Sequence, residues 1–127
     1  MSNVPRKIED FDLSNNLIQG ALSAPSDVLV NMKRLSIGSN MLWGSLTDIS
    51  VAFPNLRELD LSNNVISGSI PDSIAELLAL SILNLAGNSL TSTIPPLLAN
   101  LLRLQQLNLS NNKVSGTVPK VLGWLGE

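Results

Sequence analysis

The amino-acid sequence repeats itself every 24 residues along nearly the whole chain. In each repeat two apolar columns, separated by one residue, are followed at a fixed distance by an asparagine. The first apolar column comprises Phe11, Leu35, Leu59, Leu83 and Leu107, and the second comprises Leu13, Ile37, Leu61, Leu85 and Leu109. The asparagine column comprises Asn16, Asn40, Asn64, Asn88 and Asn112. A fixed period of this length indicates a solenoid of stacked coils rather than a globule around one central core.

The period divides the chain into about five coils, which together form a single domain over residues 1–127. The coils span residues 8–31, 32–55, 56–79, 80–103 and 104–127, with residues 1–7 as a partial N-terminal cap. One coil cannot close a core alone, so stacking against its neighbours stabilises it. The first two coils depart from the rest, because Ser23 and Thr47 replace the later proline, and Ser26 and Ser50 replace the later apolar residue of the Ile74 column.

The segment LRELDLSNN shows how one coil begins. Leu59 and Leu61 alternate with Glu58, Asp60 and Ser62, which predicts a short strand with one face inward. Equivalent strands of neighbouring coils must then lie parallel. The column asparagines should be buried, because a side-chain amide at this position can bond the backbone of the turn that leaves the strand.

Three further features mark the rest of the repeat, though not in every coil. Gly20, Gly44, Gly68 and Gly116 are expected to form tight bends. Prolines 71, 95 and 119 follow a second strand-like pair. Beyond the proline, Ser73 and Glu76 have the spacing of a helix capping box, which predicts a short helical segment that buries Ile74, Leu77 and Leu80.

The segments LRELDLSNNVISGSIPDSIAELLAL and LQQLNLSNNKVSGTVPKVLGWL resemble the plant-type leucine-rich repeat, LxxLxLxxNxLxGxIPxxLxxLxx. The resemblance covers roughly residues 8–125. It implies an α/β repeat solenoid, a right-handed curved superhelix with a parallel β-sheet on the concave face and short helices or 3-10 turns on the convex face. Plant receptor kinases, receptor-like proteins and polygalacturonase inhibitors share this architecture. It implies no particular ligand, since function lies in the variable surface positions.

Composition excludes several function classes. Histidine and cysteine are absent, which removes the usual zinc ligand sets, thiol nucleophiles and Ser/His triads. No cofactor, metal or enzymatic activity is therefore expected. A net charge of −2 without a basic run argues against nucleic acid, and no apolar stretch is long enough to cross a membrane. The family resemblance favours an extracellular location, whereas the missing cysteines and signal sequence favour an intracellular one.

Outward strand positions define the expected concave face. The candidate partner-binding residues are Asp10, Asp12, Arg34, Glu58, Asp60, Asn84 and Asn108. Ser36, Ile82 and Gln106 occupy the remaining outward positions. Arg34 should lie between Asp10 and Glu58, which indicates either an exposed ladder of ion pairs or an acidic patch for a basic or amide-rich partner.

Two tryptophans are candidate contact points. Trp43 shares a solvent-facing column with Gln19 and Ser67, so it is either an interface hot spot or packed against a neighbouring coil. Trp124 either shields the C-terminal end of the stack or contacts a second chain.

These features lead to one main interpretation and one alternative. The main one is a non-catalytic module that binds another protein or a peptide on a rigid solenoid. The alternative is an ice-binding or structural surface, on which Ser67, Thr91 and Ser115, with Ser69, Thr93 and Thr117, form a flat hydroxyl ladder. The uncovered end coils also predict end-to-end self-association or membership of a larger assembly.

Overall fold

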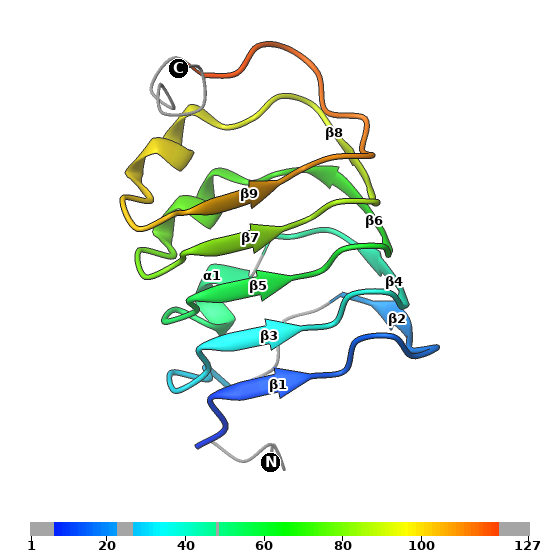
Figure 1. Cartoon of the computed structure of the whole chain (residues 1–127), viewed down its shortest axis with the longest axis vertical. Coiled ribbons are helices and arrows are strands. Elements are labelled where there is room, and N and C mark those ends of the chain that lie inside the picture. Colours follow the sequence, from blue (N-terminus) through cyan, green and yellow to red (C-terminus); the bar gives the residue numbers. More distant parts are fainter. Residues whose placement is uncertain (1–6, 23–26, 48, 120–127) are drawn as a thin grey trace.

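The structure of the protein is a computed structural model that describes residues 7–22, 27–47 and 49–119. The chain winds into a right-handed solenoid in which successive coils stack along the long axis (Figure 1). The strands of one sheet run along the front of this view, and the helical turns lie on the opposite side. This arrangement confirms the α/β repeat solenoid that the sequence predicts.

The first sheet forms the concave face and takes one strand from each coil. Its five parallel strands are, in spatial order, β1 (Asp10–Asp12), β3 (Arg34–Ser36), β5 (Glu58–Asp60), β7 (Ile82–Asn84) and β9 (Gln106–Asn108). Residues 24 positions apart lie side by side, so Leu59 pairs with Leu35 and with Leu83. The sheet thus keeps the period of the sequence.

A second sheet of shorter strands follows at the edge of the solenoid. It contains β2 (Gln19–Ala21), β4 (Met41–Gly44), β6 (Val65–Ser69) and β8 (Ser89–Thr91), all parallel. Here the partners are 22 residues apart, as with Trp43 beside Val65 and Ser67 beside Ser89. Each step along this sheet therefore slips by two residues relative to the 24-residue repeat.

Short helical turns cover the opposite side of the core. They are α1 (Ile49–Ala52) and the two 3-10 turns η1 (Asp72–Glu76) and η2 (Pro96–Asn100). The capping box predicted for η1 is wrong. Pro71, with extended backbone, takes the N-cap position, so Ser73 already lies inside the turn. Its hydroxyl donates instead to the carbonyl oxygen of Thr47 in the preceding coil, at 3.4 Å.

The second coil fills its core differently from the later coils. Later coils bury Ile74 or Leu98, whereas the second coil has Ser50 at that position. The α-helical turn α1 places Ile49, one residue earlier, in the core instead. Ser50 is buried as well, and its hydroxyl donates to Oε2 of Glu76 at 3.4 Å. A change of helix type thus compensates for the degenerate repeat.

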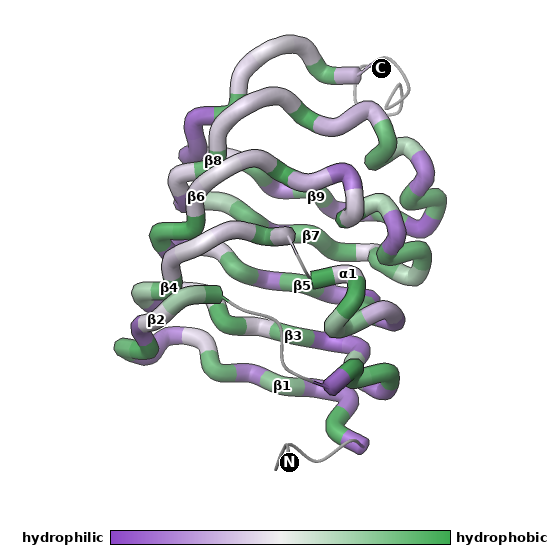
Figure 2. The backbone as a smooth tube through the Cα atoms, turned by 180° about the vertical axis from the view of Figure 1, so that it is seen from behind, coloured by the Kyte–Doolittle hydropathy of each residue, from purple (hydrophilic) through white to green (hydrophobic). Residues whose placement is uncertain are grey.

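The leucine columns form one continuous core. Leu59, Leu61, Leu83 and Leu85 have no exposed surface, and apolar and polar segments recur at equivalent places in successive coils (Figure 2). Phe11 of the first coil, in contrast, is 37% exposed, because it packs against a neighbouring coil on one side only among the described residues. Burial is therefore greatest in the middle of the stack.

The asparagine column forms a ladder that is buried at Asn40 and Asn64, half-buried at Asn88 and Asn112 and exposed at Asn16, so the expected burial holds only in the middle of the column. Oδ1 of Asn64 accepts the backbone N–H of Leu42 from the preceding coil at 2.9 Å. Its Nδ2 group donates to the carbonyls of Ile37, Leu61 and Ser62 at 3.0 to 3.2 Å. The amide thus bonds two coils together and satisfies backbone groups that the turn leaves unpaired.

The bend glycines adopt the left-handed backbone that their position requires. Gly44 and Gly68 have φ angles of 101° and 83°, and Ser92, at the same position of the fourth coil, has a φ of 67°. Side chains other than glycine strain the backbone in this region, because Cβ approaches the following carbonyl oxygen.

This strain gives a prediction about Ser92. We expect Ser92→Gly to raise the free energy of unfolding by about 0.5 to 1 kcal/mol, because relief of strain exceeds the entropy that glycine loses on folding. Gly68→Ser should lower it by a similar amount, since a Cβ at Gly68 would meet no atom closer than 3.9 Å and only the backbone conformation would suffer. Urea unfolding of both variants and of the unmodified chain measures these two changes in the free energy of unfolding. Equal stability of all three proteins would contradict the strain at Ser92.

Candidate functional site: the concave surface

The outward side chains of the first sheet line a hollow of about 500 Å³ on the concave face. Every strand of the sheet contributes to it. All seven candidate partner-binding residues of the concave face lie here: Asp10, Asp12, Arg34, Glu58, Asp60, Asn84 and Asn108. Ser36, Ile82 and Gln106 complete the outward rows. The structure thus brings together on one surface residues that are far apart in the sequence.

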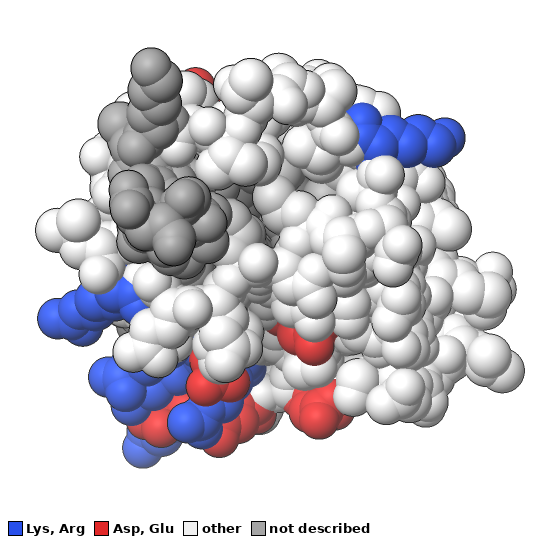
Figure 3. Space-filling view, turned by 45° about the horizontal axis from the view of Figure 1, so that its top comes forward, with Lys and Arg blue, Asp and Glu red and all other residues white. Residues whose placement is uncertain are grey.

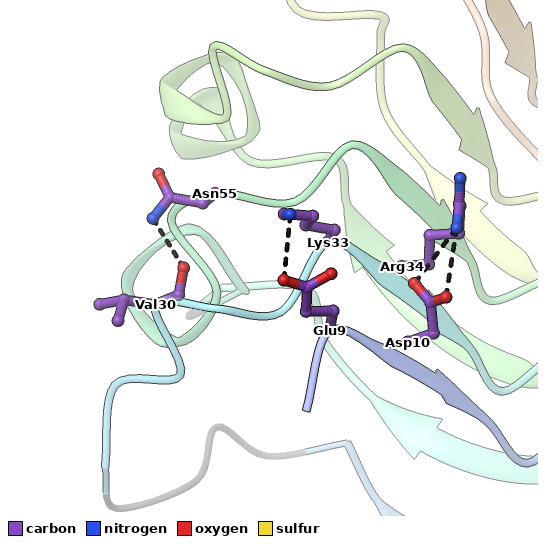
Figure 4. Close-up of polar contacts among 6 residues, drawn as sticks. All are labelled: Glu9, Asp10, Val30, Lys33, Arg34 and Asn55. Atoms are coloured by element: carbon purple, nitrogen blue, oxygen red, sulfur yellow. Dashed lines mark hydrogen bonds and ion pairs between the residues drawn. The ribbon is translucent and has the colours of Figure 1, made fainter. Parts of the chain in front are cut away.

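The first outward row consists of residues 10, 34, 58, 82 and 106, one from each strand. It begins with the ladder of ion pairs that the sequence allows. Arg34 lies 3.2 Å from Oδ2 of Asp10 and 3.3 Å from Oε1 of Glu58, on the two flanking strands. The hydrogen bond with Glu58 and the charge of Asp10 raise the pKa of the Arg34 guanidinium. Figure 4 shows the pair with Asp10 and, beside it, Lys33 with Glu9 at 3.1 Å. All of these side chains are solvent-exposed, so the ladder adds little to stability.

The second outward row consists of residues 12, 36, 60, 84 and 108. Hydrogen bonds to the turns that follow the strands hold most of its side chains in place. In four of its side chains Oδ1 accepts the backbone N–H two residues later, at 2.9 to 3.2 Å. These side chains are Asp12, Asp60, Asn84 and Asn108. The bonds from the hydroxyl and backbone of Ser14 lower the pKa of Asp12. With Oδ1 bonded to the turn, each of these side chains is held in a fixed orientation on the concave face.

Charge is unevenly distributed along this surface. Four carboxylates and a single guanidinium belong to the first three strands, whereas β7 and β9 present only amide and apolar side chains. At the boundary, Nδ2 of Asn84 donates to Oδ2 of Asp60 at 3.5 Å. Figure 3 likewise shows acidic and basic side chains gathered over the N-terminal coils. The concave surface is therefore acidic in its N-terminal half and amide-rich in its C-terminal half.

The concave surface presents carboxylates and amides at strand spacing. Within the described ranges no group of three or more His, Cys, Asp or Glu is placed to hold a metal ion, and no helix is long and apolar enough to cross a membrane. Fixed carboxylates and amides at strand spacing can bond successive polar groups of an extended chain.

Of the two candidate tryptophans, the structure describes only Trp43. Trp43 on β4 is 55% exposed, and its neighbours on the adjacent strands are Ala21 and Val65. The sequence had placed Gln19 and Ser67 beside it, which is wrong because of the two-residue slip of the second sheet. Trp124 lies outside the described residues.

The same slip changes the neighbours within the predicted hydroxyl ladder. Ser67 pairs with Ser89 rather than with Thr91, and Thr93 pairs with Ser115. The ladder assumed that the 24-residue period holds in both sheets, but the second sheet advances by 22 residues. Hydroxyl side chains still lie side by side in this register, as with Ser69 and Thr91, but not in the pairs that the 24-residue period predicts. The alternative function has no support.

Sequence reasoning missed a hollow of about 480 Å³ on the helical side. Leu78 and Leu102 line it, together with Glu76 and Arg103. These two leucines occupy the same column, at a position where the repeat specifies no apolar residue, and Leu102 is almost fully exposed. An apolar residue at an unspecified position in two successive coils is the signal that could have found this hollow.

Comparison with known proteins decides the family. The model of the family described as leucine rich repeat matches residues 30–90 and, in an overlapping second match, residues 54–114. The chain belongs to the leucine-rich repeat family. A comparison with curated protein sequences found no match.

Solved structures of leucine-rich repeat proteins from Arabidopsis thaliana share the fold. A chain of the BIR3–SERK2 complex is 36% identical, with a TM-score of 0.80 over 84% of this chain and 57% of that one. The ectodomain of the receptor kinase HAESA, in complex with an IDA peptide hormone, is 41% identical, with a TM-score of 0.84 over 88% of this chain and 19% of that one. The GASSHO1/SCHENGEN3 ectodomain, in complex with CASPARIAN STRIP INTEGRITY FACTOR 2, is 32% identical, with a TM-score of 0.84 over 94% and 14%. This leucine-rich repeat chain thus spans about half the length of the first of these and less than a fifth of the others.

Proposed function

We propose that this leucine-rich repeat chain is a non-catalytic interaction module whose concave surface binds a peptide or an extended segment of another protein. The observation that carries the proposal is the row of concave carboxylates and amides whose Oδ1 atoms are bonded to the backbone. Side chains that are already ordered lose little conformational entropy when a partner binds.

The similar structures support a protein or peptide as the partner. HAESA was solved with a peptide hormone, and a chain similar to this one was solved in a complex of two proteins, BIR3 and SERK2. Both show that solenoids of this fold take part in such complexes.

The charge of the surface indicates the kind of segment. Asp12 and Asp60 flank Ser36 in the second row and attract Lys or Arg side chains over a Debye length. Asn84 and Asn108 follow on β7 and β9 and can bond amides and hydroxyls. We therefore expect a segment that is basic where it crosses β1 to β5 and uncharged where it crosses β7 and β9.

Selection from a display library of random linear peptides tests the proposal. Recovered peptides should be enriched in Lys and Arg, and their affinity should fall as the salt concentration rises. Asp60→Asn keeps the bond from Ser62 to Oδ1 but removes the charge, so it should weaken binding by about tenfold.

Asp72→Asn is the matched control, because it makes the same change of charge on the exposed turn η1, on the helical side. Its affinity should equal that of the unmodified chain. Peptides without basic enrichment that bind the Asp60 and Asp72 variants equally well would contradict a concave site. End-to-end self-association would use other surfaces, the edges of the outermost strands, and does not depend on the concave face.

A further inference from the structure

Four turns on the helical side of the solenoid carry an apolar residue at the same position. They lead into β3, β5, β7 and β9, and each is closed by one backbone hydrogen bond, as from the N–H of Leu80 to the carbonyl of Leu77 at 3.0 Å. Leu77 and Leu80 have no exposed surface, whereas Leu78 between them is 63% exposed. The turn is therefore anchored by its two buried ends, and Leu78 does little to fill the core.

The apolar residues of these turns form one column. It comprises Val30, Pro54, Leu78 and Leu102, and Leu102 is 90% exposed. The turns lie one above another along the left of Figure 1, and Nδ2 of Asn55 donates to the carbonyl of Val30 at 2.8 Å, which ties two of them together. A single exposed apolar side chain is ordinary, but an apolar column on successive turns is the kind of patch that marks an interaction site.

Two adjoining hollows make this column part of a groove. Pro54, Leu78 and Leu102 line the hollow of about 480 Å³ described above. A second hollow of about 480 Å³ lies where the turns enter the strands, and Arg57 lines it. Leu102 and Arg103 line both hollows, so the two are continuous. This turn groove has an apolar part at Leu78 and Leu102 and a basic part at Arg57 and Arg103.

Charge in the basic part of the turn groove is unbalanced. Arg57 and Arg103 are exposed, and neither makes an ion pair with a described residue. By contrast, Lys33, one coil before Arg57 in the same column, lies 3.1 Å from Glu9. Among the described residues that line the groove only Glu76 is acidic, and it belongs to the apolar hollow. The basic part therefore has two guanidinium groups without a carboxylate between them.

A ligand for the turn groove must match both parts. A guanidinium group binds a carboxylate through two parallel hydrogen bonds, so an Asp or Glu side chain suits Arg57 and Arg103. A leucine-sized side chain suits the space beside Leu78 and Leu102, because it removes their apolar surface from water. An inorganic anion fits the basic part but leaves the apolar part uncovered. A protein segment supplies both groups within a few residues.

We propose that the turn groove binds an acidic segment of another protein. A carboxylate of the segment pairs with Arg57 and Arg103. A neighbouring apolar side chain packs between Leu78 and Leu102, where Glu76 repels a second carboxylate and so sets the direction of the segment. This site is separate from the concave surface, so the inference does not rest on the proposed function. Its ligands are acidic, whereas those expected on the concave surface are basic.

An array of linear peptides tests the proposal with the whole chain. The peptides are about 12 residues long, and each carries two Asp and two Leu residues at varied spacing in a background of Ser and Gly. A matched array carries Asn in place of Asp. Members of the first array should bind, their affinity should fall as the salt concentration rises, and their Asn counterparts should bind about tenfold more weakly. An array without a binding peptide, or equal binding of the two arrays, would overturn the proposal.

Glutamine variants test the basic part. Arg57→Gln and Arg103→Gln remove the charge from exposed side chains, so folding should be preserved. Each should weaken binding of the tightest array peptide by about tenfold. Lys113→Gln is the matched control, because it removes one positive charge from an exposed residue that lines neither hollow. Equal affinity of these three variants would overturn the role of the two arginines.

Serine variants test the apolar part and the nature of the occupant. Leu102→Ser should weaken binding of the same peptide by about tenfold, because less apolar surface is buried. Leu17→Ser is the matched control, since Leu17 is 82% exposed and lines neither hollow. Equal affinity of the two variants would overturn the apolar contact. Without peptide, Leu102→Ser should leave the sedimentation of the chain unchanged. A dimer that this variant dissociates would assign the groove to a second copy of the chain and overturn the proposal.

Discussion

Leu83→Ala is expected to lower the free energy of unfolding by about 2 to 5 kcal/mol. Leu83 has no exposed surface and pairs in register with Leu59 and Leu107 on both sides. Its truncation removes apolar contacts with two coils and leaves a cavity that neither coil can fill. A domain of this size has about 5 to 15 kcal/mol of stability in total, so most of the folded population should be lost under mild denaturation.

Leu107→Ala is the matched control for this prediction. It makes the same change in the same column, but Leu107 is only partly buried. Its cost should be less than half that of Leu83→Ala, because less apolar surface is returned to water. Urea unfolding followed by circular dichroism measures both variants. Equal losses at the two positions would show that the end coils are packed as tightly as the middle ones.

Asn64→Ala is expected to cost about 1 to 3 kcal/mol. The substitution leaves the N–H of Leu42 and the carbonyl of Ile37 without the bonds that Asn64 makes to them in the preceding coil. It also removes the bonds to Leu61 and Ser62 within its own turn. Buried backbone groups without partners are costly because folding has taken them out of water.

Asn16→Ala distinguishes the stability that comes from bonds between coils from the stability that comes from bonds within the turn. Asn16 is exposed and bonds only to its own turn, so its loss should cost less than 1 kcal/mol at concentrations where the chain is monomeric. Thermal unfolding of the two alanine variants, at one low protein concentration, makes the comparison. An Asn64 variant that melts like the unmodified chain would contradict the ladder.

The first sheet and its concave rows could be predicted from the sequence because they follow its period. Residues 24 apart are neighbours there, so the ion pairs of Arg34 with Asp10 and Glu58 follow directly from their columns. The buried asparagine at position 64 follows from the same spacing, since a side-chain amide can accept one backbone N–H and donate to several carbonyls of the turn.

Features that depend on three-dimensional context could not be predicted from the period. The second sheet pairs Trp43 with Val65 because its strands slip by two residues per coil, and the repeat alone does not specify this slip. Ser50 was recognised as a departure from the repeat, but the change of helix type that buries Ile49 depends on how the second coil packs. The predicted capping box of η1 is wrong because the turn begins earlier than the motif assumes, with Pro71 and not Ser73 at the N-cap position.

Mapping of a bound peptide by NMR tests the central claim most directly. A peptide selected by the chain is added to the isotope-labelled protein, and the backbone amide signals that move are assigned. The account predicts the largest changes along β1, β3, β5, β7 and β9, with β4 and η1 little affected. Changes centred instead on Trp43 of β4, or on Leu78 and Leu102 on the helical side, would contradict the concave surface as the binding site.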